Sequence, residues 1–424
     1  MKRVLMIAYH FPPLAGSSGI QRTLRFVQHL PAFGWQPMVL SAHPRAYERT
    51  ADDLSAEVPA GTVVRRAFAL DTARHLAVGG RYIGALARPD RWMTWRFDAV
   101  RQGLQMIRRH RPDAIWSTYP IATAHVIGAE LQRRSGLPWI ADFRDPMAQD
   151  GYPQDPLTWR AFKDIETLAV QQARACCFTT PGAAAIYRSR YPQAAERMQV
   201  LENGFDEEAF VAAESAAAAA AEKGQSGPLN PGCLTLLHSG IVYPEERDPA
   251  HLIAALGQLR RRLPVLAATL RLRFRAAVHD ALLAALARQH GVTDLIELCP
   301  PVGYAAALQE MLRADGLLVM QAANCNAQVP AKIYEYLRAG RPILCLSHPA
   351  GDTWRVLQRA GLSRMAQLDD SAQIEALLQD IAGGDTRGCV ADASAFASES
   401  RRARSAELAA LLDRCGPGRP DGAG

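Results

Sequence analysis

The stretch Pro330-Ala-Lys-Ile-Tyr-Glu-Tyr-Leu-Arg-Ala-Gly-Arg-Pro342 decides how the fold is interpreted. Pro330 suits a helix start, because its ring fixes φ and its missing N–H would be unpaired there anyway. Apolar residues recur at helical spacing after it, and Gly340 ends the helix. The apolar run 316–320 precedes the stretch, and residues 342–346 read as the next buried strand. Strand, loop, short helix, glycine and strand form the skeleton of a phosphate-binding α/β unit.

Two charged side chains of this stretch are candidate binding residues. Lys332 falls in the first turn of the predicted helix, where backbone N–H groups are also available, and Glu335 follows on nearly the same face. On local spacing alone, a routine αβ unit with a solvated Lys–Glu pair is the favoured interpretation. Evidence from the rest of the chain is needed to distinguish this interpretation from a phosphate-binding site.

Composition bounds the classes of protein that fit. A chain of 424 residues, with 49% hydrophobic and 21% charged residues, is predicted to form two globular domains. The net charge of +6 permits attraction to phosphates or anionic membranes, and we expect no nucleic-acid partner. No apolar run reaches the roughly 18–20 residues that span a bilayer. The cysteines lack C-x-x-C spacing and are expected to be buried in a reducing cytoplasm.

Strand-like and helix-like segments alternate through both halves of the chain. The predicted strands are residues 3–9, 36–40, 62–64, 113–117, 139–142, 176–179, 199–201, 234–240, 270–274, 294–298, 317–320 and 342–346. They show little polar alternation, as in sheets covered on both faces. The predicted fold class is therefore α/β, with doubly wound parallel sheets. Ligands of such sheets bind beyond the carboxyl ends of the strands.

Two loops of the first half meet this condition with suitable residues. Small residues at 15–19, including Gly16 and Ser17, would let a ligand approach the backbone before a helix predicted over residues 20–33. Asp142, Arg144 and Asp145 cluster at the end of another strand. An Arg–Asp pair that braces a loop and a catalytic or acceptor-binding role explain this cluster about equally well.

Residues 65–109 combine many arginines with five aromatic residues, Phe68, Tyr82, Trp92, Trp95 and Phe97. This blend allows peripheral contact with an anionic membrane or with a lipid-linked acceptor. Solvated helices whose aromatic side chains enter the core explain it as well, and the sequence leaves both interpretations open.

The best domain boundary follows Glu202-Asn-Gly-Phe-Asp206. The next residues are nearly pure alanine and then rich in Gly, Ser and Pro, which favours a helix followed by a flexible connection. We predict a first domain over 1–206, a linker over 207–231 and a second domain over 232–390. A C-terminal helix over 391–415, which could pack back on the first domain, and a disordered tail over 416–424 complete the division.

The chain resembles a family 4 glycosyltransferase with the GT-B fold, of the type found in bacterial cell-surface polysaccharide synthesis. The resemblance covers residues 1 to about 412. Five motifs in the family's order carry it: Tyr9-His-Phe-Pro-Pro13 with Gly16 and Gly19, Trp139-Ile-Ala-Asp-Phe-Arg-Asp-Pro146, Glu202-Asn-Gly-Phe-Asp206, His238-Ser-Gly240 with Arg247-Asp-Pro249, and Lys332 through Pro342.

The resemblance implies two Rossmann-like domains facing across a cleft. The second domain would hold a nucleotide-sugar donor, and the first an acceptor. It also implies a hexosyltransferase-type reaction that retains anomeric configuration with no cofactor and no bound metal, the nucleotide-sugar being a co-substrate. Carried over, Glu335 would bind the donor ribose, Gly240 would form the turn below the diphosphate, and Arg247 would replace a phosphate-binding lysine. Gly16 would face the donor phosphates from the first domain.

Three departures from the family pattern affect the predicted site. Ala327 stands where the family often has a first glutamate, and Ile241 stands where an arginine usually follows the glycine turn. The family's histidine near the transferred sugar falls close to Thr118, so it is missing. His125 is a candidate substitute, although a buried structural histidine fits as well. With Ala327 in place, sugar recognition would rely on polar residues of the same loop, chiefly Asn324.

The sequence therefore predicts a cytoplasmic glycosyltransferase, either free or at the inner face of the cell membrane, that acts on a glycan or lipid-linked acceptor. Asp142, Arg144, Asp145 and His125 are its candidate catalytic residues. A nucleotide-sugar epimerase or hydrolase, and a non-catalytic partner subunit of the same fold, are the alternatives.

Overall fold

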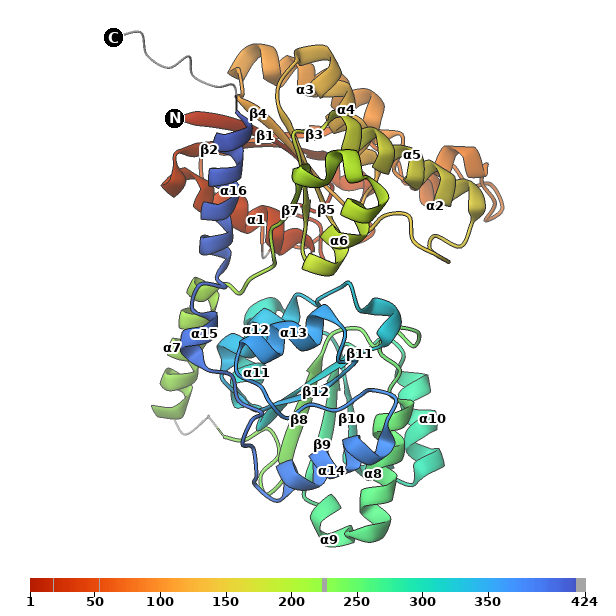
Figure 1. The fold of residues 1–424 in the computed structure, drawn as a ribbon, viewed down its shortest axis with the longest axis vertical. Coiled ribbons are helices and arrows are strands. Elements are labelled where there is room, and N and C mark those ends of the chain that lie inside the picture. Colours follow the sequence, from red (N-terminus) through yellow and green to blue (C-terminus); the bar gives the residue numbers. More distant parts are fainter. Residues whose placement is uncertain (18, 53, 223–226, 417–424) are drawn as a thin grey trace. The chain divides into compact units, whose positions relative to one another are not determined.

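The computed structural model describes residues 1–17, 19–52, 54–222 and 227–416. The chain divides into two compact units (Figure 1). The first unit comprises Met1–Asn203 and Arg401–Gly424, and the second comprises Gly204–Ser400. The chain therefore leaves the first unit after Asn203 and returns to it at Arg401.

A parallel sheet of seven strands forms the centre of the first unit, in the order β3-β2-β1-β4-β5-β6-β7. Its strands are β1 Lys2–Ile7, β2 Trp35–Ala42, β3 Val63–Ala67, β4 Ala114–Thr118, β5 Trp139–Arg144, β6 Ala175–Phe178 and β7 Met198–Val200. Side chains alternate between two cores: Leu5 and Ile7 enter one hydrophobic cluster, whereas Val4 and Met6 enter the other. Both faces of the sheet are covered, which is why the strands read as unbroken apolar runs.

Seven α-helices accompany this sheet among the described residues. They are α1 Gly19–His29, α2 Thr72–His75, α3 Trp95–His110, α4 Thr123–Ser135, α5 Pro156–Gln172, α6 Pro181–Arg190 and α16 Arg401–Cys415. The first helix continues as a 3₁₀ turn, Leu30–Phe33, and ends at Gly34 with φ +84°. That positive φ is the left-handed cap for which glycine is favoured.

A parallel sheet of five strands forms the centre of the second unit, in the order β10-β9-β8-β11-β12. Its strands are β8 Leu234–Ser239, β9 Leu270–Arg275, β10 Ile296–Cys299, β11 Gly316–Gln321 and β12 Ile343–Ser347. Its helices are α7 Glu207–Glu222, α8 Ala250–Arg262, α9 Pro264–Ala267, α10 Asp280–His290, α11 Tyr304–Arg313, α12 Lys332–Ala339, α13 Asp352–Arg359, α14 Ser371–Ala382 and α15 Ala393–Phe396.

Each sheet has one point where the strand order reverses. In the first unit it lies between β1 and β4, and in the second between β8 and β11. Loops leave in opposite directions at such a point, so a crevice forms at the carboxyl ends of the two strands. The loops that follow β1, β8 and β11 hold five of the predicted site residues: Gly16, Ser17, Gly240, Arg247 and Asn324.

The predicted linker over 207–231 is wrong for its alanine-rich part, which forms α7 in the second unit. Phe210 and Ala213 of α7 are buried in one cluster with Leu308 and Met311 of α11. Arg338 of α12 binds two glutamates of α7, and its guanidinium lies over the Phe210 ring at 5.1 Å. A helix held by these contacts belongs to the unit, and the chain enters that unit at Gly204 instead of after residue 206. Residues 223–226 lie outside the described residues.

The C-terminal segment also differs from the single helix predicted over 391–415. It contains α15 in the second unit and α16 in the first. Leu408, Leu411 and Leu412 of α16 share a cluster with Leu24 and Val27 of α1. Of the predicted tail 416–424, residues 417–424 lie outside the described residues. In the part of the chain that the structure describes, no helix is long and apolar enough to cross a membrane.

Candidate functional site

The glycine that follows β8 brings a lysine across the end of the strand. Gly240 has φ +115°, and a Cβ atom built there would lie 3.2 Å from Nζ of Lys332. Only glycine combines this backbone conformation with so close an approach at little cost. The loop after β8 and the start of α12 therefore meet at the switch point of the second sheet.

Lys332 lies against a neutral histidine. Its Nζ is 3.1 Å from Nε2 of His238, and Nδ1 of His238 is 3.1 Å from the carbonyl oxygen of Leu318. Since that carbonyl can only accept, Nδ1 carries the imidazole proton, and Nε2 offers its lone pair to the ammonium group. Burial and the adjacent Lys332 lower the pKa of His238 well below its usual value. Burial and Arg247 likewise lower the pKa of Lys332, which Glu335 partly offsets.

Arg247 is the second cation of this site. Its Nη1 donates to the carbonyl oxygen of Ile241 at 2.9 Å, and its guanidinium lies over the Tyr243 ring at 5.1 Å. Its Nε atom is buried and has no hydrogen-bond partner among the described residues. Because such a donor gains from an acceptor, the guanidinium is suited to an anionic ligand that approaches the loop after Gly240.

The helix α12 supplies the remaining predicted donor-site residue. Glu335 is 9% exposed, and its Oε1 accepts a hydrogen bond from the Tyr304 hydroxyl at 3.0 Å. The next residue, Tyr336, accepts the N–H of Ser239 at 2.9 Å and so fixes α12 to the end of β8. Lys332 and Glu335 therefore lie in a helix whose position relative to Gly240 is set by a specific contact.

The loop after β11 is partly committed to internal contacts. Asn324 donates through Nδ2 to the carbonyl oxygen of Glu245 at 2.9 Å, which joins this loop to the loop after Gly240. Asn326 lies 3.3 Å from Nδ1 of His348 through its Nδ2 atom. The structure thus brings Gly240, Arg247, Asn324, Lys332 and Glu335 into one unit, as predicted, but gives Asn324 a loop-bracing contact.

In the first unit, the loop after β1 packs against the loop after β5. Ser17 Oγ lies 3.1 Å from Nδ1 of His10 and accepts the N–H of Gly19 at 3.3 Å. A Cβ atom at Gly19 would lie 2.5 Å from His10 Nδ1 and 2.9 Å from Arg144 Nη1. Gly16, with φ +80°, has open space where a side chain would be. Glycine at 19 is therefore required for His10 and Arg144 to approach the helix start.

Arg144 adopts an unusual backbone conformation at the end of β5. Its φ is +64°, at a register irregularity between β5 and β6. Its Nη1 points to the carbonyl oxygen of Tyr119 at 3.4 Å, and its buried Nε has no hydrogen-bond partner among the described residues. Burial and this guanidinium lower the pKa of His10 to about 3, so His10 is neutral at physiological pH. Non-glycine residues with positive φ carry strain that recurs at functional sites.

Asp145 lies beside Arg144 but differs from it in environment. Its carboxylate accepts a long hydrogen bond of 3.4 Å from the Thr179 hydroxyl. Burial raises its pKa, while Arg144 and Arg22 oppose that rise. Arg144 is thus brought together with His10 and Ser17 near the switch point of the first sheet, whereas Asp145 faces Thr179 after β6.

The catalytic prediction for Asp142 does not fit its environment. The residue is fully buried, and its carboxylate accepts two hydrogen bonds from Arg22, at 2.9 and 2.8 Å. The Thr118 hydroxyl adds a third at 2.9 Å. A buried carboxylate that already accepts three hydrogen bonds is not accessible to a substrate. The catalytic prediction for Asp142 is therefore wrong, and the residue forms a structural ion pair with Arg22.

The prediction for His125 is corrected as well. Its side chain is fully buried, with Nδ1 2.8 Å from Ser117 Oγ and its ring 4.8 Å from that of Phe143. Burial lowers its pKa to about 4. His125 is a core residue of α4 and does not replace the family's histidine near the sugar.

Three residues of these sites were not singled out in the sequence: His10, His238 and Tyr304. Both histidines fall inside quoted motifs. His10 lies three residues after β1 and His238 lies near the end of β8, two residues before Gly240, so their place at strand ends was a usable signal. Tyr304 begins α11, thirty-one residues from its partner Glu335, and local spacing gives no sign of that contact.

Residues 18–204 match the model of the glycosyl transferase 4-like domain. HepE from Anabaena, solved in complex with UDP, matches with a TM-score of 0.67 and 15% identity, over 98% of this chain and 100% of that one. WaaG, a glycosyltransferase involved in lipopolysaccharide biosynthesis, matches with a TM-score of 0.58 and 15% identity, over 97% and 95%. Sucrose-phosphate synthase from Thermosynechococcus elongatus matches with a TM-score of 0.62 and 12% identity, over 98% and 96%.

A search of curated protein sequences gives no match. At such low identities the solved structures establish the fold, and the family model matches the first unit. Two parallel-sheet α/β units, matched along nearly the whole chain, are the GT-B architecture that the sequence predicted. The chain therefore has the GT-B fold, and its residues 18–204 match the glycosyl transferase 4-like domain.

Proposed function

We propose that this glycosyltransferase moves a sugar from a nucleoside diphosphate donor, bound by the second unit, to a glycan or lipid-linked acceptor in cell-surface polysaccharide synthesis. The observation that carries the proposal is the contact of Lys332 with Gly240 at the switch point, with Arg247 in the same loop. HepE was solved in complex with UDP and with UDP-glucose, which supports a nucleotide-sugar donor. WaaG is involved in lipopolysaccharide biosynthesis, which supports a role in cell-surface polysaccharide synthesis. The proposed location is the cytoplasm, at the inner face of the membrane.

The chemistry of the leaving group explains why two cations suit this place. The bond between the sugar's anomeric carbon and the diphosphate oxygen breaks, and that oxygen keeps the electron pair. The acceptor hydroxyl forms the new bond to the anomeric carbon, and its proton passes to the departing diphosphate. Negative charge thus develops on the diphosphate, where Lys332, Arg247 and the N–H groups at the start of α12 can stabilise it. We propose that these groups suffice without a metal ion and that configuration is retained.

Glu335 is the proposed ribose ligand. An ionised carboxylate only accepts hydrogen bonds, which matches the two hydroxyls of a ribose. Its present partner, the Tyr304 hydroxyl, occupies Oε1 and orients the carboxylate. A side chain held in this way is prepared for a bidentate partner and loses little entropy on binding.

Titration calorimetry with UDP, other nucleoside diphosphates and inorganic pyrophosphate tests the donor site. We expect binding of at least one nucleoside diphosphate, and weaker binding of pyrophosphate because it lacks the ribose. Failure of every nucleoside diphosphate to bind would contradict the proposal.

A turnover assay separates transfer from the alternative of an epimerase or hydrolase. The fold by itself admits this alternative, since UDP-GlcNAc 2-epimerase from Neisseria meningitidis matches with a TM-score of 0.56 and 9% identity. We expect the donor to stay intact without acceptor and to be consumed with a cell-envelope acceptor extract. NMR of the product's anomeric proton then reads the configuration. Release of free sugar or of an epimer without acceptor would favour the alternative.

A further inference from the structure

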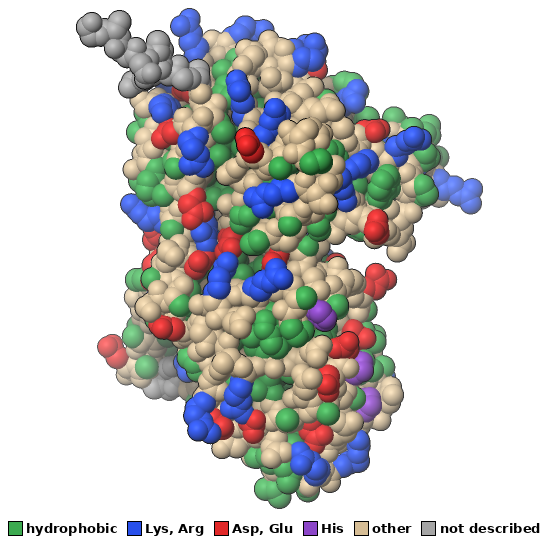
Figure 2. Space-filling view, in the orientation of Figure 1, with side chains coloured by type: hydrophobic (Ala, Val, Ile, Leu, Met, Phe, Trp, Pro, Cys, Tyr) green, Lys and Arg blue, Asp and Glu red, His purple; other side chains and the backbone are tan. Residues whose placement is uncertain are grey.

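A short segment of the first unit exposes several large apolar side chains. Residues 77–88, here called the arm, expose Val78 by 85% and Ile83 by 69%, with Tyr82 at 44% and Leu86 at 38%. Gly79 and Gly80 both have positive φ, and a bridge joins Val78 to Arg81, so the arm turns back on itself. Figure 2 shows hydrophobic and basic side chains gathered on the part of this unit that carries α2. Apolar side chains clustered in this way mark an interaction site.

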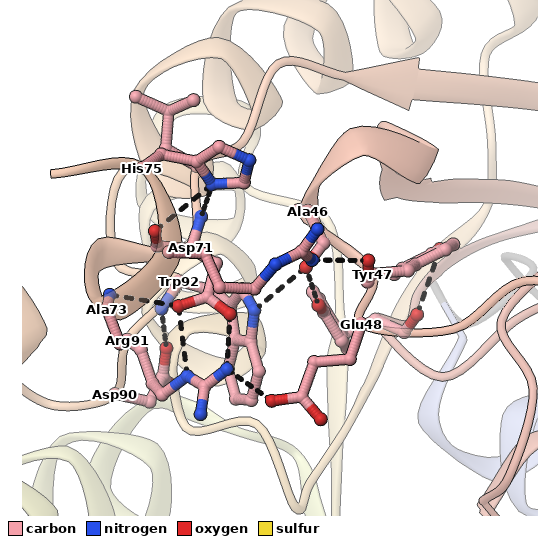
Figure 3. A network of polar contacts seen from close by, with 12 residues as sticks. Ala46, Tyr47, Glu48, Asp71, Ala73, His75, Asp90, Arg91 and Trp92 are labelled. Carbon is pink, nitrogen blue, oxygen red and sulfur yellow. Dashed lines mark hydrogen bonds and ion pairs between the residues drawn. The ribbon is translucent and has the colours of Figure 1, made fainter. Parts of the chain in front are cut away.

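A polar network holds the base of the arm (Figure 3). Arg91 donates through Nε to Asp71 at 3.0 Å and also forms ion pairs with Asp71 and Glu48. The Trp92 ring donates to the carbonyl oxygen of Ala46 at 3.2 Å. Asp71 is fully buried, so this network is a fixed part of the unit. The exposed apolar residues are therefore presented on an anchored support.

The positive charge of the chain is concentrated around the arm. Residues 65–109 contain ten arginines and three aspartates, a formal charge of +7, whereas the whole chain carries +6. The rest of the chain therefore has a formal charge of −1. An excess of positive charge in this segment favours the approach of an anionic surface to it.

A groove adjoins the base of the arm. It has a volume of about 690 Å³, and its floor is apolar, with side chains of α3, α4 and α5 that include Leu104, Val126 and Leu168. Five arginines line it: Arg96, Arg101, Arg108, Arg133 and Arg134. Arg96 and Arg108 have no acidic partner among the described residues, while the other three pair with Asp98 or Glu130. Asp90 links groove and arm, since its carboxylate binds the N–H and hydroxyl of Thr123 at the start of α4.

We propose that the arm and this groove dock the first unit on an anionic lipid bilayer. The arm places Val78, Tyr82, Ile83 and Leu86 in the boundary between headgroups and acyl chains. Arg81, Arg96 and Arg108 bind lipid phosphates. Apolar side chains flanked by arginines match a layered surface that is apolar inside and anionic at its edge. The inference concerns a surface of the first unit, whereas the proposed donor site belongs to the second, and it does not depend on which sugar is transferred.

Vesicle co-sedimentation tests the proposal with the full-length protein. We expect binding to phosphatidylcholine vesicles that contain phosphatidylglycerol, weak binding to pure phosphatidylcholine, and a loss of binding as salt is raised. The double variant Val78→Asp with Ile83→Asp should bind the anionic vesicles roughly tenfold more weakly or worse. Arg81→Gln should weaken binding about fivefold, the value of one arginine at such a surface.

Val265→Asp is the matched control, because Val265 is 83% exposed in the second unit and should be neutral. Nucleoside diphosphate binding, measured on every variant, reports whether the protein is still folded. Vesicle binding that survives in the double variant, or that is equal on neutral and anionic vesicles, overturns the proposal. A wild-type protein that binds neither kind of vesicle also overturns it. So does self-association through the arm, which gel filtration would show as a larger apparent size for the wild-type protein than for the double variant.

Discussion

The two switch points of this molecule have the same topology but use charge in different ways. In the first unit Arg22 and Asp142 are both almost fully buried and satisfy each other with two hydrogen bonds. In the second unit Lys332 faces a neutral histidine, and Arg247 keeps a buried donor without a partner among the described residues. The first arrangement holds loops in place, whereas the second leaves positive charge for a ligand. A polar cluster at a strand end is therefore a binding site only if its charges are not already paired.

The largest expected effect comes from breaking the pair in the first unit. Asp142→Ala leaves the Arg22 guanidinium buried without its carboxylate, and we expect a loss of about 3–5 kcal/mol in the free energy of unfolding. Urea unfolding followed by circular dichroism measures it. Asp145→Asn is the control, since the hydrogen bond from Thr179 is the one its carboxylate accepts among the described residues and is long, so the cost should be much smaller. Equal stability losses for both variants would remove the distinction between them.

In the second unit, removal of a cation at Lys332 should weaken ligand binding without lowering the stability of the fold. Lys332→Met takes away a partly buried cation and its charged hydrogen bonds to a diphosphate, so UDP and pyrophosphate should both bind about 2–3 kcal/mol more weakly. The free energy of unfolding should not fall, because neutral His238 is the hydrogen-bond partner of Lys332 among the described residues, and burial of the ammonium group opposes its charge. Calorimetry and urea unfolding give the two values. A stability loss with unchanged affinity would make Lys332 structural, like Arg22.

A smaller and more selective effect is expected at Glu335. Glu335→Ala should weaken nucleoside diphosphate binding by about 1–3 kcal/mol, the scale of lost charged hydrogen bonds. Pyrophosphate has no ribose, so its affinity should not change. If both ligands lose affinity equally, or neither does, Glu335 does not bind the ribose. The pair of ligands thus separates the ribose contact from the phosphate contacts of Lys332.

The smallest expected effect is a pH dependence of donor binding. In the free protein the pKa of Lys332 is well below its usual value, and a bound diphosphate stabilises the ammonium form and raises that pKa. Affinity is therefore full below the lowered pKa and decreases, by at most about tenfold per pH unit, as the pH rises from it to the raised pKa of the complex. Calorimetry in buffers of different ionisation enthalpy measures the proton uptake. Lys332→Met should abolish the proton uptake that accompanies binding and is due to Lys332. If the substitution leaves the proton uptake unchanged, another group takes up the proton.

The sequence predicted the sheets well because its strands are covered on both faces. Runs such as 316–320 and 342–346 have no polar alternation, and they became β11 and β12 within a residue or two. Local spacing placed Lys332 and Glu335 on nearly the same face of one helix, but their role in donor binding came from the family resemblance and stays a prediction. Local spacing could not show that Tyr336 joins α12 to β8, a contact between residues 97 positions apart.

The errors have a common physical cause. Asp142 and His125 are polar residues near strand ends, and the sequence does not tell whether such a side chain faces solvent or the core. Their partners decide it, and Arg22 lies 120 residues from Asp142. The alanine run after residue 211 looked like a linker because alanine leaves little to bury. A single large residue, Phe210, fixes that helix to its unit, together with the ion pairs of Arg338.

The return of the chain to its first unit at Arg401 sets the order in which the protein can be made. During synthesis the second unit is complete when Ser400 emerges, while α1 still lacks the α16 leucines that cover it. Until then Leu24 and Val27 stay uncovered on a folding intermediate, which is the kind of surface that promotes aggregation. A chain released at a stop codon before residue 401 would keep that surface permanently, even though every proposed donor-site residue has already been made. Nonsense mutations in the last few dozen codons would therefore harm solubility before they harm chemistry.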